Sequence, residues 1–183
     1  MRIDLEKSFD QGHIDPAKLS PFQKILLTTD GTVTDILEAY CSEPMQVVKL
    51  SEELVEIDSD IPALELEKHA KVIKRNIFLR GRISHKNHIY AESTLSFDRL
   101  ERNFQNELLK TKTPIGKIWL EQRIETFKEI IHSGREAAGP LAESFNLTPE
   151  DTLLFRTYCV FCDRRPTMMI TEKFPESHFL NHL

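Results

Sequence analysis

The sequence predicts a single α+β domain in which helices pack against an antiparallel sheet. Three observations support this fold class. The chain has 183 residues, 40% of them hydrophobic, which is enough for one core. Short β-favouring runs follow one another across hairpin-length connections, and helical runs do not alternate regularly with them as a parallel sheet requires. We expect residues 1–19, which carry little periodicity, to form a partly ordered lead-in, and residues 20–183 to form the domain.

The first regular element is expected to be a helical hairpin. Ser20 is a suitable N-cap, Pro21 suits the first helical position, and Gln23 completes a capping box. An Asp-Gly turn within residues 29–32 ends this helix. Helical spacing resumes over residues 33–40, so the two helices form a hairpin.

Runs of residues that favour β-strands begin after this helical hairpin and occur again near the C-terminus. Residues 82–87 read as a hairpin connection, so the runs on either side of it should be antiparallel neighbours. Two helices, from about Asp98 and from Thr113-Pro114, interrupt the strands. The predicted strands are residues 47–57, 71–81, 87–97, 125–134, 152–163 and 166–175.

Composition narrows the possible partners. The net charge of −5 gives no electrostatic reason to expect nucleic acid. No apolar run is long enough to cross a membrane, and the N-terminus is too polar for a signal peptide, so we expect a cytoplasmic protein. Phosphate-binding loops and the serine-hydrolase elbow are missing from the sequence.

The cysteines and histidines suggest no metal site. The three cysteines are an odd, sparse set, as expected for a reduced chain. Cys159 and Cys162 resemble a metal or redox pair, but an offset of three within a strand places them on opposite faces. The seven histidines show no metal-binding spacing.

Two charged residues interrupt otherwise apolar strand faces. Alternation with a period of two gives Arg75 the neighbours Ile73, Ile77 and Leu79. In the last strand it gives Glu172 the neighbours Met168, Ile170 and Phe174. A charge on a buried face is costly unless a partner or ligand compensates for it.

Arg75 and Glu172 therefore allow two interpretations. In the first, they form one buried ion pair, or a slip of parity places one of them in solvent. In the second, they mark opposite ends of an apolar pocket for a flat ligand. Arg75 would then bind a ligand carboxylate, and Glu172 would accept a hydrogen bond from a ligand hydroxyl.

An ordered set of motifs resembles the chorismate pyruvate-lyase family over roughly residues 20–176. The motifs are KRNIFLRG, YAESTLSF, LLKTKTPIGKIW, TFKEIIHSGRE and RRPTMMITEKFP. The resemblance implies a six-stranded antiparallel sheet with packed helices, and an internal pocket under helical flaps. It also implies removal of pyruvate from chorismate to leave 4-hydroxybenzoate, without a metal or organic cofactor.

The same resemblance assigns site residues. Arg75 corresponds to the arginine that binds the ring carboxylate, and Glu172 to the glutamate that faces the ring hydroxyl. The backbone N–H of Ile115 is expected to bind the carboxylate as well. Val33, or its neighbour Thr32, falls where the first flap supplies a second backbone donor.

The second carboxylate of chorismate, on its enolpyruvyl side chain, also needs a basic partner. Arg135, Arg156 and Lys117 are the candidates from the sequence. Two other readings stay open: a non-catalytic binder of aromatic carboxylates, which would share the fold of repressor effector-binding domains, and an α+β protein whose two charges pair internally. Too few residues precede residue 20 for a winged-helix domain, which disfavours a repressor.

Overall fold

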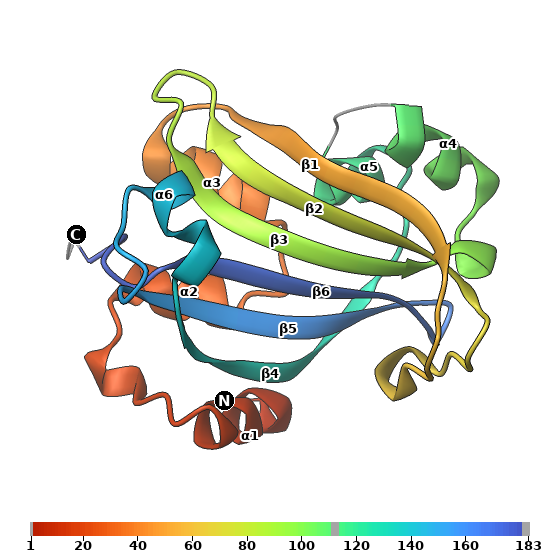
Figure 1. The fold of residues 1–183 in the computed structure, drawn as a ribbon, viewed down its shortest axis with the longest axis horizontal. Helices are drawn as coiled ribbons and strands as arrows, with labels where there is room; N and C mark the ends of the chain where they lie inside the picture. Colours follow the sequence, from red (N-terminus) through yellow and green to blue (C-terminus); the bar gives the residue numbers. More distant parts are fainter. Residues whose placement is uncertain (1, 111–113, 181–183) are drawn as a thin grey trace.

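The computed structural model describes residues 2–110 and 114–180, and Figure 1 shows its ribbon. The strands are β1 (Met45–Glu56), β2 (Lys71–Gly81), β3 (Asn87–Ser96), β4 (Phe127–Ala137), β5 (Thr152–Cys162) and β6 (Arg165–Pro175). The helices are α1 (Ile3–Gln11), α2 (Pro21–Thr28), α3 (Val33–Cys41), α4 (Arg102–Lys110), α5 (Ile115–Glu121) and α6 (Ala142–Phe145), with 3-10 turns η1 (Pro16–Lys18), η2 (Pro62–Leu64), η3 (Phe97–Arg99) and η4 (Gly139–Leu141). No helix in the described ranges is long and apolar enough to cross a membrane.

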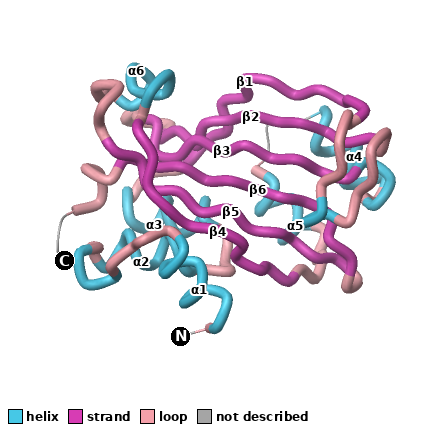
Figure 2. The backbone as a smooth tube through the Cα atoms, turned by 60° about the horizontal axis from the view of Figure 1, so that its bottom comes forward, coloured by secondary structure: helices cyan, strands magenta, loops and turns pink. Residues whose placement is uncertain are grey.

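The strands form a six-stranded sheet in the order β1-β2-β3-β6-β5-β4. Each neighbouring pair is antiparallel, and Figure 2 shows the strands running side by side from β1 to β4. Hairpins join β2 to β3 and β5 to β6, and the β3–β6 pairing joins the two halves. This confirms the predicted α+β class and the predicted pairing of the second and third strands.

Helices α2 to α5 cover one face of the sheet, which we call the inner face, whereas the short α6 packs on the other face through Phe145 against Phe78 and Tyr90. At one end α2 and α3 pack on residues such as Ile77 and Leu154. At the other end α4 and α5 pack on Ile73, Leu95 and Tyr158, and Figure 1 shows the two helix pairs at opposite ends. The middle of the inner face, between the pairs, is where the site lies.

The helical hairpin has the predicted cap. The Ser20 hydroxyl accepts a hydrogen bond from the Gln23 backbone N–H at 3.1 Å, and the Gln23 side-chain oxygen accepts one from the Ser20 N–H at 3.0 Å. The Gln23 amide also donates to the Glu176 carbonyl at 2.7 Å. The capping box therefore both starts α2 and ties it to the end of β6.

The segment expected to be a partly ordered lead-in contains the helix α1 and the 3-10 turn η1. α1 lies beside the edge strand β4, where the Ser8 and Ser133 hydroxyls are 2.8 Å apart. A Cβ on Gly12 would lie 1.8 Å from the Ser133 carbonyl oxygen, so glycine permits this approach. The buried Leu5 and Phe9 join the inner core. Tertiary packing stabilises a short helix in which only Leu5, Ser8 and Phe9 are buried.

The helix expected from Asp98 begins later than predicted. Phe97–Arg99 form η3, and α4 starts at Arg102. The long connection between β4 and β5 contains η4 and α6. These differences concern element boundaries and leave the sheet unchanged.

Cys159 and Cys162 lie on different sides of β5, as predicted. Cys159 is buried with Leu64 and Val72, and its thiol donates to the Ala63 carbonyl at 3.1 Å. Cys162 instead accepts a hydrogen bond from the Thr167 hydroxyl at 3.6 Å. In the described part of the chain both thiols are free.

We expect the stability of the fold to depend on pH through His178. Burial, followed by the charges of Lys86 and His88, lowers the pKa of His178 to about 4. Since the folded pKa lies below the unfolded value of about 6.5, His178 contributes stability above pH 6.5 that is lost as pH falls towards 4. Urea unfolding should show a loss of roughly 1 kcal/mol from this partly exposed group between pH 7.5 and 5.

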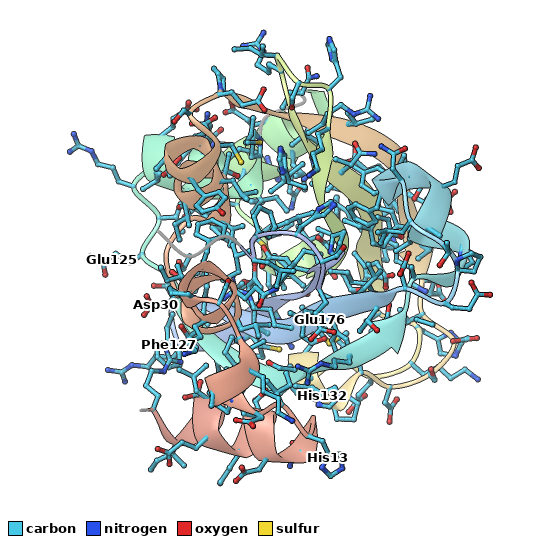
Figure 3. The ribbon with its side chains drawn as sticks, turned by 90° about the vertical axis from the view of Figure 1, so that its left-hand side faces the viewer. His13, Asp30, Glu125, Phe127, His132 and Glu176 are labelled. Atoms are coloured by element: carbon cyan, nitrogen blue, oxygen red, sulfur yellow. The ribbon has the colours of Figure 1, made fainter. Side chains whose placement is uncertain are left out.

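The matched test replaces His178 by phenylalanine. His178→Phe should lose less stability than the parent over the same pH range, whereas His13→Asn should behave like the parent because His13 is exposed at the end of α1 (Figure 3). An unchanged pH dependence in His178→Phe would show that this assignment is wrong.

Candidate active site

A small cavity lies on the inner face, beneath the N-terminal ends of α3 and α5. Its volume is about 60 Å³, which is small beside the roughly 300 Å³ or more of a typical ligand pocket. For an aromatic acid to bind here the cavity has to widen, and the starts of α3 and α5 border it. All the site residues predicted from the sequence line this cavity: Thr32, Val33, Arg75, Ile115 and Glu172.

Arg75 is a buried cation with incomplete hydrogen bonding. Its side chain is 1% exposed, and its Nε lies 3.2 Å from a carboxylate oxygen of Glu52. That contact does not have hydrogen-bond geometry, and Arg75 Nε and Nη2 have no hydrogen-bond partner within the described part of the chain. Burial lowers the pKa of Arg75 and the charge of Glu52 opposes this. The guanidinium stays charged and can still bind an anion.

Glu172 has different partners. One of its oxygens accepts from Arg156 Nε at 2.9 Å, and the other accepts from the Tyr158 hydroxyl at 3.1 Å. Arg75 pairs with Glu52 instead, and one strand, β3, separates β2 from β6, which places the two backbones roughly 10 Å apart. The interpretation that Arg75 and Glu172 form one ion pair is therefore wrong.

Arg156 completes a buried polar cluster around Glu172. Its side chain is fully buried, donates from Nη1 to the Thr29 carbonyl at 2.6 Å, and lies over the Tyr158 ring at 4.9 Å. Burial, reinforced by the charge of Glu172, holds the pKa of Tyr158 well above its usual range. Tyr158 therefore remains a hydrogen-bond donor. The hydrogen bond from Arg156 to the Thr29 carbonyl also ties the turn after α2 to the sheet.

Two helix N-termini converge at the cavity. Thr32 is the N-cap residue of α3 and makes no side-chain capping bond, and Pro114 holds the same position on α5. A Cβ on Gly116 would lie 2.5 Å from the Thr32 side chain, so this glycine lets the helices approach. Backbone N–H groups at helix N-termini favour anions. They add to the positive potential that Arg75 creates.

Lys128 and Trp119 are cavity residues that the sequence reasoning missed. Lys128 is 6% exposed, and its Nζ donates to the Gly31 carbonyl at 2.8 Å. It lies over the rings of Trp119 and Tyr158, at 5.7 and 5.5 Å from their centroids. Burial lowers the pKa of Lys128, and the charge of Glu172 opposes this. The alternation that identified Arg75 could have found Lys128, because it shares a face with the buried Ile130.

Two of the three candidates for the second carboxylate lie elsewhere. Arg135 pairs with Glu176 at 2.9 Å, and Lys117 pairs with Glu38 at the same distance. Neither residue is among those that line the cavity. Arg156 is close to the cavity through Glu172, and its Nη2 has no hydrogen-bond partner within the described ranges.

The fold defines a class of α+β domains in which helices pack on a six-stranded antiparallel sheet. It is similar to the effector domain of PhnF from Mycobacterium smegmatis, with a TM-score of 0.65 and 10% identity over 83% of this chain and 93% of that one. At this identity the likeness concerns the fold alone. It agrees with a six-stranded sheet covered by helices.

The sequence comparisons identify the family. The Rv2949c-like chorismate pyruvate-lyase model matches residues 27–181. The chorismate pyruvate-lyase of Mycobacterium leprae is 36% identical, over 61% of this chain and 53% of that protein, so the match spans about half the length of this relative. That of Mycobacterium tuberculosis strain H37Rv is 29% identical, over 88% of this chain and 83% of its own length. The chain belongs to the Rv2949c-like chorismate pyruvate-lyase family, which is a family of lyases.

Proposed function

We propose that the enzyme binds chorismate in this cavity and eliminates pyruvate, leaving 4-hydroxybenzoate. The observation that carries the proposal is Arg75, a buried guanidinium at the cavity wall with two nitrogens lacking hydrogen-bond acceptors within the described ranges. A ligand carboxylate supplies the missing acceptors. The family relationship supports chorismate as that ligand.

The proposed roles follow from position. Arg75 binds the ring carboxylate, and the backbone N–H groups of Ile115 and of Val33, or of Thr32, contribute further donors at the helix N-termini. Glu172 accepts a hydrogen bond from the ring hydroxyl. It already has two partners, but a carboxylate has about four lone-pair positions, so one more contact is possible.

The reaction breaks the C–O bond between the ring and the enolpyruvyl group. The ring carbon that bears the hydroxyl loses its hydrogen, and the ring becomes aromatic. The departing fragment becomes pyruvate when its methylene carbon gains a proton. Because aromatisation drives this change, the protein mainly has to hold a reactive conformer away from water. Closure of α3 and α5 over the cavity fits this task.

Incubation of the purified protein with chorismate tests the proposal. We expect equal amounts of 4-hydroxybenzoate, measured by chromatography, and pyruvate, measured with lactate dehydrogenase. Lys74→Ala serves as a control because Lys74 is exposed on the same strand as Arg75. Binding of 4-hydroxybenzoate without turnover of chorismate would contradict the proposal and favour a non-catalytic binder of aromatic carboxylates.

A further inference from the structure

Lys128 is a buried cation without a carboxylate partner. Arg75 forms an ion pair with Glu52, and Arg156 forms one with Glu172. The hydrogen bond from Lys128 Nζ goes to a neutral carbonyl, that of Gly31, and no carboxylate of the described residues lies within ion-pair distance. A buried ammonium with no carboxylate in direct contact is costly, so this arrangement is expected where an anion binds.

The nearest acidic groups are engaged elsewhere. Glu172 is held by Arg156 and the Tyr158 hydroxyl. Asp30, at the turn between α2 and α3, has a side chain that is 73% exposed and lies 3.5 Å from Arg2. Figure 3 shows Asp30 towards the same side of the molecule as Phe127, which directly precedes Lys128. The Lys128 ammonium therefore lines the cavity without a direct ion-pair partner among the described residues, although the charges of Glu172 and Asp30 favour its protonated form.

Trp119 supplies a second, independent sign of a ligand. Its side chain is 7% exposed and lines the same cavity as Lys128. Its indole Nε1–H is buried and has no hydrogen-bond partner within the described ranges. Buried indole N–H groups normally have an acceptor. An anion beside Lys128 would provide one.

Lys128 and Arg75 lie on strands in opposite halves of the sheet. β2 carries Arg75 and β4 carries Lys128, with β3, β6 and β5 between them. Both residues line one cavity, and the pair of Glu172 with Arg156 lies on the intervening strands β6 and β5. The cavity thus has cations at two separate positions, which suits a ligand with two carboxylates.

We propose that Lys128 and the Trp119 N–H bind the second carboxylate of a dicarboxylate substrate, the one on the departing enolpyruvyl group. This inference rests on the proposed function and names the partner of that carboxylate. Arg75 suits the ring carboxylate because its planar fork and the helix N-termini fix one orientation. Lys128, a flexible point charge, suits a group that must leave.

The test compares a dicarboxylate with a monocarboxylate ligand. Lys128→Met should lower kcat/KM for chorismate at least about tenfold, because a charge-assisted contact is lost. It should change the affinity for 4-hydroxybenzoate, measured by calorimetry, less than about threefold, because this product lacks the second carboxylate. Its melting temperature should not fall, because a buried charge with no carboxylate in direct contact is removed. Lys74→Met, which removes an exposed lysine, is the control.

A second variant keeps the test decisive. Trp119→Phe retains an aromatic ring but removes the N–H, and it should also reduce kcat/KM for chorismate more than affinity for 4-hydroxybenzoate. Equal losses of both quantities with a lower melting temperature in Lys128→Met, or unchanged kcat/KM, would overturn the inference. Failure of the proposed function itself would be seen separately, as a parent protein that does not convert chorismate.

Discussion

Arg75→Ala is expected to lose chorismate turnover and product binding while remaining folded. The change removes a charge-assisted contact to a desolvated carboxylate, worth roughly 2 to 5 kcal/mol, so kcat/KM should fall at least about tenfold. Affinity for 4-hydroxybenzoate should weaken with it. The fold should survive because Glu52, the partner left behind, also pairs with Lys49 at 2.6 Å. Steady-state kinetics, calorimetry and thermal melting measure the three quantities.

The control for Arg75→Ala is Lys74→Ala, which removes a neighbouring positive charge on the other face of β2. Lys74 is exposed and outside the cavity wall. It should leave turnover and binding near parent values. If Arg75→Ala melted far below the parent, or kept full affinity for 4-hydroxybenzoate, Arg75 would be a structural residue and the assigned role would be wrong.

Glu172→Gln is expected to have the largest effect on stability. The change keeps the shape but leaves Arg156, which is 0% exposed, without its counter-ion. Removing one partner of a buried pair costs roughly 3 to 5 kcal/mol. For a chain of this size that lowers the melting temperature by about 6 to 20 °C. Turnover should also fall, because a neutral amide is a weaker acceptor for the ring hydroxyl.

A double variant separates the charge effect from lost packing. Replacing both Arg156 and Glu172 by methionine removes the unpaired charge, so much of the stability should return. Turnover should not return, because the acceptor for the ring hydroxyl is gone. A double variant as unstable as the sum of the single changes would show that the two side chains do not act as a pair.

Strand alternation found Arg75 and Glu172 because both are single charges on apolar faces. The rule describes which face a side chain occupies, and the structure puts both on the inner face at one cavity. It could not assign their partners. Glu52 lies opposite Arg75 on β1, and Arg156 lies opposite Glu172 on β5, and both pairings depend on strand order and register. Pairing between segments distant in the sequence is decided by tertiary structure.

The parts that the sequence did not reveal share a physical cause. α1 is a short helix that buries only Leu5, Ser8 and Phe9, and it gains its stability by packing on β4, a contact that local signals do not reveal. Lys128 sits in a run that was recognised as a strand, yet its partner is the carbonyl of Gly31 from a distant turn. The Trp119 N–H is recognisable only because it lacks an acceptor among the residues that the structure describes. Each of these features needs three-dimensional contacts.

The most direct measurement is a crystal structure of the protein with 4-hydroxybenzoate. We expect the carboxylate to accept hydrogen bonds from Arg75 and from backbone N–H groups at the starts of α3 and α5, with the hydroxyl directed at Glu172. The starts of α3 and α5 should lie farther apart than they do around the present cavity of about 60 Å³. Product bound elsewhere on the protein, with Arg75 still lacking a ligand and the cavity closed, would contradict a chorismate site on the inner face.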